Sequence, residues 1–175
     1  MNRAITIRDA RPEDARAIAE VHVEGWRWGY RDILPAEHLA ALSIDEREAD
    51  WHQGLIDPAP GSARFVAIDD AGVVGFAGIG LADDDFAPPP SGAAELYAIY
   101  VREAAKRTGV GRALIERATD AMRANGSRHA VLWVFEANDR ARRFYEAVGW
   151  SPDGARAEHR FDGGSRPVLR FAREL

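Results

Sequence analysis

The chain has 175 residues, 46% of them hydrophobic and 29% charged, which is typical of a soluble globular protein with a single domain over residues 1–175. Its lack of cysteine excludes disulfides, zinc–thiolate sites and a cysteine nucleophile, and its net charge of -5 argues against nucleic acid as a partner. Because it has neither an apolar run of about 18 residues nor an apolar N-terminal segment, we expect no membrane association and a cytoplasmic location.

Hydrophobic periodicity and turn residues predict an alternation of strands and helices. The expected elements are, in chain order, a strand at 4–8, helices at 12–25, 36–42 and 45–55, strands at 63–68, 73–81 and 96–101, a helix at 112–124, a strand at 129–135, a helix at 138–148, and strands at 155–161 and 168–173. Residues 82–92 contain an acidic run and three prolines, and they predict a polar surface loop.

The stretch at 95–124 reads as a strand, a basic turn with glycines, and a helix. The turn runs from Lys106 to Gly111, and Arg112 follows it. A helix start presents unpaired N–H groups with partial positive charge, and glycine lets a ligand approach the backbone closely. The pattern therefore indicates a phosphate or pyrophosphate site, the alternative being a tight turn with solvated basic side chains. The phosphate motif of nucleotide triphosphatases fits less well, since it requires a lysine where this chain has Arg112. The dinucleotide-binding motif also fits less well, since it requires glycine or alanine where this chain has Leu114.

This turn resembles the signature of the GNAT superfamily of acetyl-CoA-dependent N-acetyltransferases, which is Gln/Arg-x-x-Gly-x-Gly/Ala between a strand and a helix. Here it reads Lys106-x-x-Gly109-x-Gly111, with a lysine in place of the arginine. Many members have a proline shortly after the strand, where this chain has Glu103. Residues 132–150, LWVFEANDRARRFYEAVGW, match a second family pattern of a strand, an asparagine, an aromatic pair and a Gly-Trp. The order of the expected elements extends the resemblance over nearly the whole chain.

The resemblance implies an α/β (α+β) fold of the GNAT type. Its mixed, mostly antiparallel, twisted sheet would have about seven strands flanked by about four helices, with the central strands splayed apart. In this family the pantetheine arm of acetyl-CoA enters that gap, the turn binds the pyrophosphate, and the asparagine bonds to the cofactor arm. The cofactor-binding residues implied here are Ile99, Tyr100, Val101, Lys106, Arg107, Thr108, Gly109, Val110, Gly111, Arg112 and Asn138.

Other readings stay open for some of these positions. Asn138 also suits a helix N-cap, and both roles are compatible. Arg140, Arg142 and Arg143 either reach the nucleotide phosphate or form an exposed helix face. The five histidines show no metal-binding spacing, so we expect no metal cofactor.

The chemistry of acetyl transfer requires a base and benefits from an acid. An alkyl amine with a pKa of about 10.4 is mostly protonated at pH 7 and must lose a proton before it attacks. Tyr145 matches the tyrosine that serves as general acid in many GNAT enzymes, and a core aromatic is the alternative. Glu95 is the candidate base, two residues from Tyr97 on the same nominal strand face unless a bulge intervenes, and a solvated strand-end carboxylate is its alternative.

The acceptor site is expected near a cluster of aromatic residues. Trp26, Trp28 and Tyr30 either pack the first helices onto the sheet or form a wall of the acceptor pocket, which the family places beside this segment. The expected substrate-binding residues are Trp26, Tyr30 and Tyr97. The leading function is acetyl transfer from acetyl-CoA to a primary amine of a small molecule, by direct attack in a ternary complex. The alternatives are acetylation of a protein N-terminus or lysine, and a non-catalytic acyl-CoA-binding regulatory module; homodimers are common in this family.

Overall fold

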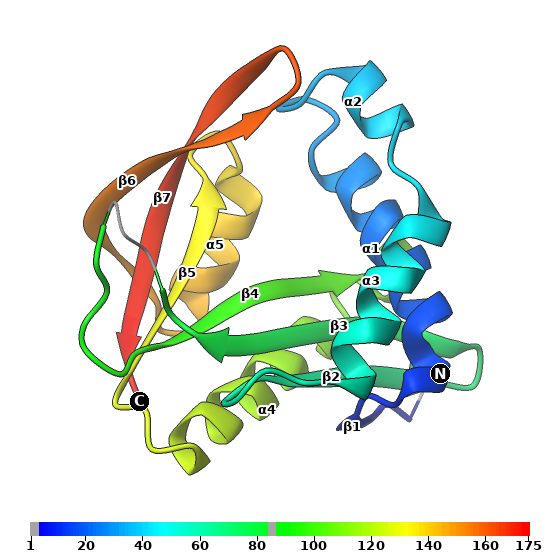
Figure 1. Ribbon diagram of the computed structural model, residues 1–175, viewed down its shortest axis with the longest axis horizontal. Coiled ribbons are helices and arrows are strands. Elements are labelled where there is room, and N and C mark those ends of the chain that lie inside the picture. Colours follow the sequence, from blue (N-terminus) through cyan, green and yellow to red (C-terminus); the bar gives the residue numbers. More distant parts are fainter. Residues whose placement is uncertain (1–3, 84–86) are drawn as a thin grey trace.

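A computed structural model describes residues 4–83 and 87–175 (Figure 1). The strands and helices are β1 (Thr6–Asp9), α1 (Ala15–Gly29), α2 (Ala36–Ala40), α3 (Ile44–Ile56), β2 (Ala63–Asp69), β3 (Gly72–Leu81), β4 (Ala94–Val101), α4 (Val110–Ala124), β5 (His129–Phe135), α5 (Asp139–Ala147), β6 (Ser151–Phe161) and β7 (Gly164–Glu174). Short 3-10 turns at Pro12–Asp14 and Glu103–Ala105 precede α1 and α4. Part of the surface loop expected at 82–92, namely 84–86, lies outside the described residues.

The strands form one sheet in the order β1-β2-β3-β4-β5-β7-β6. Every neighbouring pair is antiparallel except β4 and β5, which are parallel. This confirms the predicted mixed, mostly antiparallel sheet. Within the described residues there are five α-helices, which agrees with the five helical ranges expected from the sequence and with the approximate number that the resemblance implied.

The sheet opens between its central strands. Among the described residues the parallel ladder joins Ala94 to Ala130 and Glu95 to Val131 and then ends. Beyond this point β4 and β5 diverge (Figure 1). The rest of β4 therefore presents backbone N–H and C=O groups toward β5 without a strand partner there. The splayed arrangement implied by the resemblance is thus observed.

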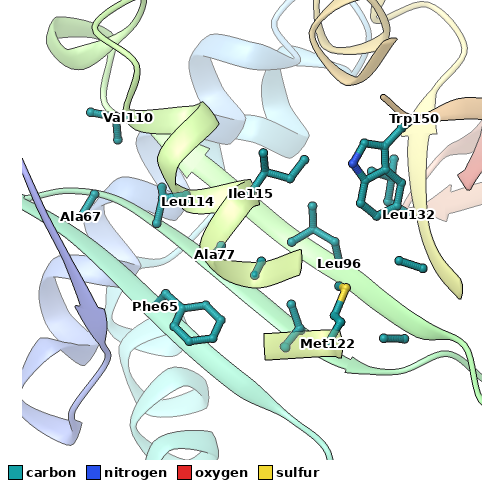
Figure 2. Packing of buried hydrophobic residues seen from close by; sticks show 14 of the residues in the cluster. Phe65, Ala67, Ala77, Leu96, Val110, Leu114, Ile115, Met122, Leu132 and Trp150 are labelled. Carbon is teal, nitrogen blue, oxygen red and sulfur yellow. The ribbon is translucent and has the colours of Figure 1, made fainter. Parts of the chain in front are cut away.

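Two apolar clusters hold the helices on the two faces of the sheet. On one face α4 buries Leu114, Ile115 and Met122 against Phe65 and other sheet residues (Figure 2). On the other face α1 and α3 pack against β2, β3 and β4 in a second cluster. A helix that is apolar along one stripe is held in this way by its buried face. No helix in the described part of the chain is long and apolar enough to cross a membrane.

Candidate functional site

A cavity of about 830 Å³ lies beside the opening between β4 and β5. Its walls are the C-terminal half of α1, the last residues of β4, the turn before α4, and the first two turns of α5. The predicted site residues that line it are Tyr30, Ile99, Tyr100, Val101, Lys106, Arg107, Gly109, Gly111, Arg112, Asn138 and Tyr145. The fold therefore brings residues from four separate parts of the sequence to one space.

Two further residues of the predicted cofactor turn have structural roles. The Thr108 hydroxyl donates a hydrogen bond to the carbonyl of Ala105 at 2.7 Å, which closes the turn. The Val110 side chain is fully buried in the cluster beneath α4. Neither side chain faces the cavity, so both residues would meet a ligand through their backbone.

The turn before α4 has a backbone suited to anions. Arg107 and Gly109 have φ angles of 63° and 91°, both in the left-handed region. Left-handed residues among right-handed ones direct successive N–H groups toward one point, a geometry that binds anions. The first N–H groups of α4 also lack partners within the helix, and the helix dipole adds partial positive charge. Gly111 offers no side chain, which leaves the backbone accessible from the cavity.

Cationic side chains surround the same space. Lys106 Nζ lies 2.7 Å from the centroid of the Trp28 ring, and Arg140 Cζ lies 3.7 Å from it. Burial, with the charge of Arg140, lowers the pKa of Lys106 to about 8. Because the two cations lie beside the same ring, an anion bound in the cavity would favour the charged form of Lys106.

The three arginines of α5 have different surroundings. Arg140 lines the cavity. Arg142 instead donates to the carbonyl of Glu136 at 3.1 Å and pairs with Asp139 at 3.2 Å. Arg143 is exposed on the helix surface. Among these three arginines, only Arg140 therefore lies where it could reach a phosphate group in the cavity.

Asn138 caps α5 and also faces the cavity. Its side-chain oxygen accepts a hydrogen bond from the N–H of Ala141 at 3.2 Å, and the residue is buried. Because the cap uses the oxygen, a ligand in the cavity would meet the side-chain NH2 group. The N-cap reading of Asn138 is correct, and a second role toward a ligand remains compatible with it.

Tyrosine hydroxyls gather at the wall formed by α1, β4 and α5. Tyr145 lines the cavity and packs against the rings of Phe144 and Phe171. Burial, with a smaller effect of Tyr30, raises the pKa of Tyr145 well above its ordinary value. The hydroxyl therefore stays protonated at neutral pH and can donate a proton or hydrogen bond. The hydroxyls of Tyr30 and Tyr100 lie 3.1 Å apart.

Glu95 and Tyr97 lie outside the cavity lining. Glu95 pairs with Val131 at the last rung of the β4–β5 ladder. Tyr97 is 41% exposed, and its ring stacks 6.3 Å from that of Trp51. Burial raises the pKa of Tyr97, and the negative charge of Glu95 adds to that effect, so the two side chains are close.

Trp26 belongs to an aromatic cluster next to the cavity. Its ring lies 5.8 Å from His22, 5.1 Å from Tyr30 and 6.0 Å from His159. His22 accepts a hydrogen bond from Trp51 Nε1 at its Nδ1 atom, at 3.1 Å, and burial lowers its pKa to about 4. His22 is therefore neutral at physiological pH. No group of three or more metal-ligating side chains occurs among the described residues.

Sequence reasoning did not assign His22 or His159 to this region, and it considered Trp28 only as a possible wall of the acceptor pocket, not as a neighbour of Lys106 and Arg140. Trp28 had a usable signal, since Gly25, Trp28 and Gly29 lie three and four residues apart on one helix face. His159 had none, because its place depends on how β6 folds back toward α1.

The segment from α1 to α2 and the β6–β7 hairpin meet over the aromatic cluster. Arg166 Nε donates to the carbonyl of Ile33 at 2.9 Å. The ring of His38 lies 5.4 Å from that of Phe161. Leu34, Leu39 and Phe135 are buried beneath these contacts. Side-chain contacts thus join the two segments on this side of the opening.

Known proteins share both sequence and fold with this chain. A sequence profile of the acetyltransferase (GNAT) family matches residues 20–150. The uncharacterized N-acetyltransferase YuaI of Bacillus subtilis is 35% identical over 159 residues, which cover 90% of this chain and 85% of that protein. The crystal structure of the PaiA N-acetyltransferase of Thermoplasma acidophilum, in complex with coenzyme A, aligns with a TM-score of 0.76 at 20% identity, over 98% of this chain and 99% of that one. A GCN5-related N-acetyltransferase from Kribbella flavida aligns with a TM-score of 0.73 at 25% identity, over 98% of each chain.

Proposed function

Because the chain belongs to the GNAT family of acetyltransferases, we propose that it transfers the acetyl group of acetyl-CoA to the primary amine of a small molecule by direct attack in a ternary complex. The observation that carries this proposal is the cavity beside the β4–β5 opening, which unites a cationic, anion-binding turn with the Tyr145 hydroxyl. PaiA, which has a similar fold, was crystallised with coenzyme A.

The residues present fit acetyl-CoA. The cofactor carries a pyrophosphate, a 3′-phosphate and a long arm with two amides. The turn from Lys106 to Arg112 would hold the pyrophosphate through its N–H groups and cationic side chains. The edge of β4 at Ile99, Tyr100 and Val101 lacks β5 as a partner and would bond to the amides of the arm. Asn138 would donate its NH2 group to the arm from the other wall.

The chemistry then needs proton transfers at two places. A base takes a proton from the ammonium form of the acceptor, and the free amine attacks the thioester carbonyl carbon. The resulting C–N bond replaces the C–S bond, CoA leaves as a thiolate, and the amide nitrogen releases one further proton, which would restore the tyrosine hydroxyl after it has protonated the sulfur. Tyr145 would donate its proton to that sulfur, since its raised pKa keeps it protonated until then. Glu95 is the proposed base, and its place outside the cavity lining implies that a water molecule carries the proton to it.

A small acceptor is proposed because two segments of the chain meet beside the opening. The contacts of Arg166 with Ile33 and of His38 with Phe161 join the α1–α2 segment to the β6–β7 hairpin. An extended peptide would need a groove at this place. Trp26, Tyr30 and Tyr97 are the proposed walls of the acceptor pocket.

A thiol-release assay tests this function. Acetyl-CoA would be offered with a panel of amines, amino acids, polyamines, aminoglycosides and short peptides. Amine-dependent release of CoA from small acceptors supports the proposal, whereas release with peptides alone would overturn the small-molecule acceptor. Binding of acetyl-CoA without release for any acceptor would favour a non-catalytic acyl-CoA-binding module.

A further inference from the structure

Trp28 contacts two cations that belong to the proposed phosphate site. The indole projects from α1, Lys106 lies in the turn before α4, and Arg140 lies in the first turn of α5. Lys106 Nζ is 2.7 Å and Arg140 Cζ is 3.7 Å from the ring centroid. All three residues line the same cavity. A single aromatic ring thus connects three separate walls of that cavity.

This contact compensates for an unfavourable arrangement. Lys106 is partly buried, Arg140 is exposed beside it, and the positive charge of Arg140 disfavours the charged form of Lys106. The face of an indole carries negative potential, so it attracts both cations and reduces their repulsion. A phosphate group would do the same more strongly, because it carries a full negative charge and accepts charge-assisted hydrogen bonds.

We propose that Trp28 competes with the phosphate groups of the cofactor for Lys106 and Arg140, so that the indole leaves these cations when the cofactor binds. This inference rests on the proposed function, because it takes the ligand to be CoA or acetyl-CoA. Trp28 then lowers the affinity of the empty protein for the cofactor and keeps the two cations in place until it arrives.

Replacement of the indole tests the competition. CoA and pantetheine, which lacks the phosphates, would be titrated calorimetrically into wild type and Trp28→Leu. Loss of a cation–π contact predicts CoA binding tighter by about 3- to 10-fold in the variant, with pantetheine affinity unchanged. Weaker CoA binding in Trp28→Leu would overturn the proposal, since it would mean that the indole holds the ligand itself.

Tryptophan fluorescence of the wild-type protein provides an independent measurement. Binding of CoA should shift the tryptophan emission of the wild type to longer wavelength, as the indole moves toward solvent. The shift should vanish in Trp28→Phe and persist in Trp133→Phe, where the lost ring neighbours Arg170 and does not line the cavity. Tight CoA binding with no Trp28-dependent shift would overturn this inference alone, whereas failure of the wild type to bind CoA would overturn the proposed function as well.

Discussion

Leu96 and Ala98 of β4 are two residues apart, yet their side chains pack on opposite faces of the sheet. Leu96 lies in the cluster beneath α4, and Ala98 lies in the cluster beneath α1 and α3. The cause is a bulge, because Ile79 pairs with Leu96 and Gly78 pairs with Ala98, which leaves Tyr97 as an extra residue. A bulge bends a strand and redirects its side chains. Here it lies between the last rung shared with β5 and the residues that line the cavity.

The first prediction concerns the proposed general acid. Tyr145→Phe should lower kcat by about 100-fold or more, because general acid–base catalysis contributes roughly that factor. CoA affinity and melting temperature should change little, since the ring and its contacts with Phe144 and Phe171 remain. Thiol release, calorimetric CoA binding and thermal unfolding would be measured on the same samples. Full turnover in the variant would remove Tyr145 from the mechanism.

The second prediction concerns the proposed base. Glu95→Gln should reduce turnover and change its pH profile, because the amide cannot accept the ammonium proton. Raising the pH should partly restore the rate, since more of the acceptor is then unprotonated. Turnover would be followed from pH 6 to 10 beside the wild type. If the two profiles coincide at all pH values, Glu95 takes no part in proton transfer.

Local sequence patterns predicted the elements that position the site. The asparagine at 138 marked a helix start, and it occupies the N-cap position of α5. The helix expected from Arg112 begins slightly earlier, at Val110, with Gly109 as its N-cap. These assignments depend on neighbouring residues alone, which explains why they succeed. The beginning of β6 was missed by four residues, because Pro152 and Gly154 resemble strand breakers. An edge strand tolerates them, and the register shifts between Pro152 and Arg156.

Features that depend on packing between distant segments could not be predicted. The sequence does not distinguish Arg140 from Arg142, since both lie in the same basic start of a helix. Arg140 lines the cavity because of where α1 lies in the fold. The contact between Trp28 and Lys106 joins residues from different walls. Tyr97 illustrates the same limit, since a bulge depends on the register with the neighbouring β3.

The third prediction separates two glycines of the turn by their effects. Gly109 has φ of 91°, and a Cβ there would meet no atom within 4 Å, so Gly109→Ala should destabilise the fold by ~1–2 kcal/mol through backbone strain alone. Gly111 lies within α4, where a Cβ would make an ordinary contact with Phe144 at 3.4 Å. Gly111→Ala should therefore raise stability by up to ~1 kcal/mol through helix propensity.

The effect of Gly111→Ala on CoA affinity should be opposite to its effect on stability. The new methyl group in Gly111→Ala would occupy the cavity, so CoA affinity should fall even though the fold is more stable. Urea unfolding and CoA titration would be carried out on both variants. A Gly111→Ala protein that binds CoA as tightly as the wild type would show that the ligand does not approach this backbone.

The last prediction concerns stability in acid. Burial lowers the pKa of His22 from 6.5 to about 4, so between these pH values the unfolded chain takes up a proton that the folded protein excludes. His22 therefore does not lower the free energy of unfolding above pH 6.5. As the pH falls below this value, its titration lowers the free energy of unfolding by ~3 kcal/mol in total. His22→Gln replaces the accepting Nδ1 atom with an amide oxygen that can accept the hydrogen bond from Trp51 Nε1, and it should flatten the pH dependence of the unfolding free energy between pH 6.5 and 4.5. His52→Gln, a change on the exposed surface of α3, provides the matched control and should retain the wild-type slope. A wild-type slope in His22→Gln would mean that other groups cause the loss of stability in acid.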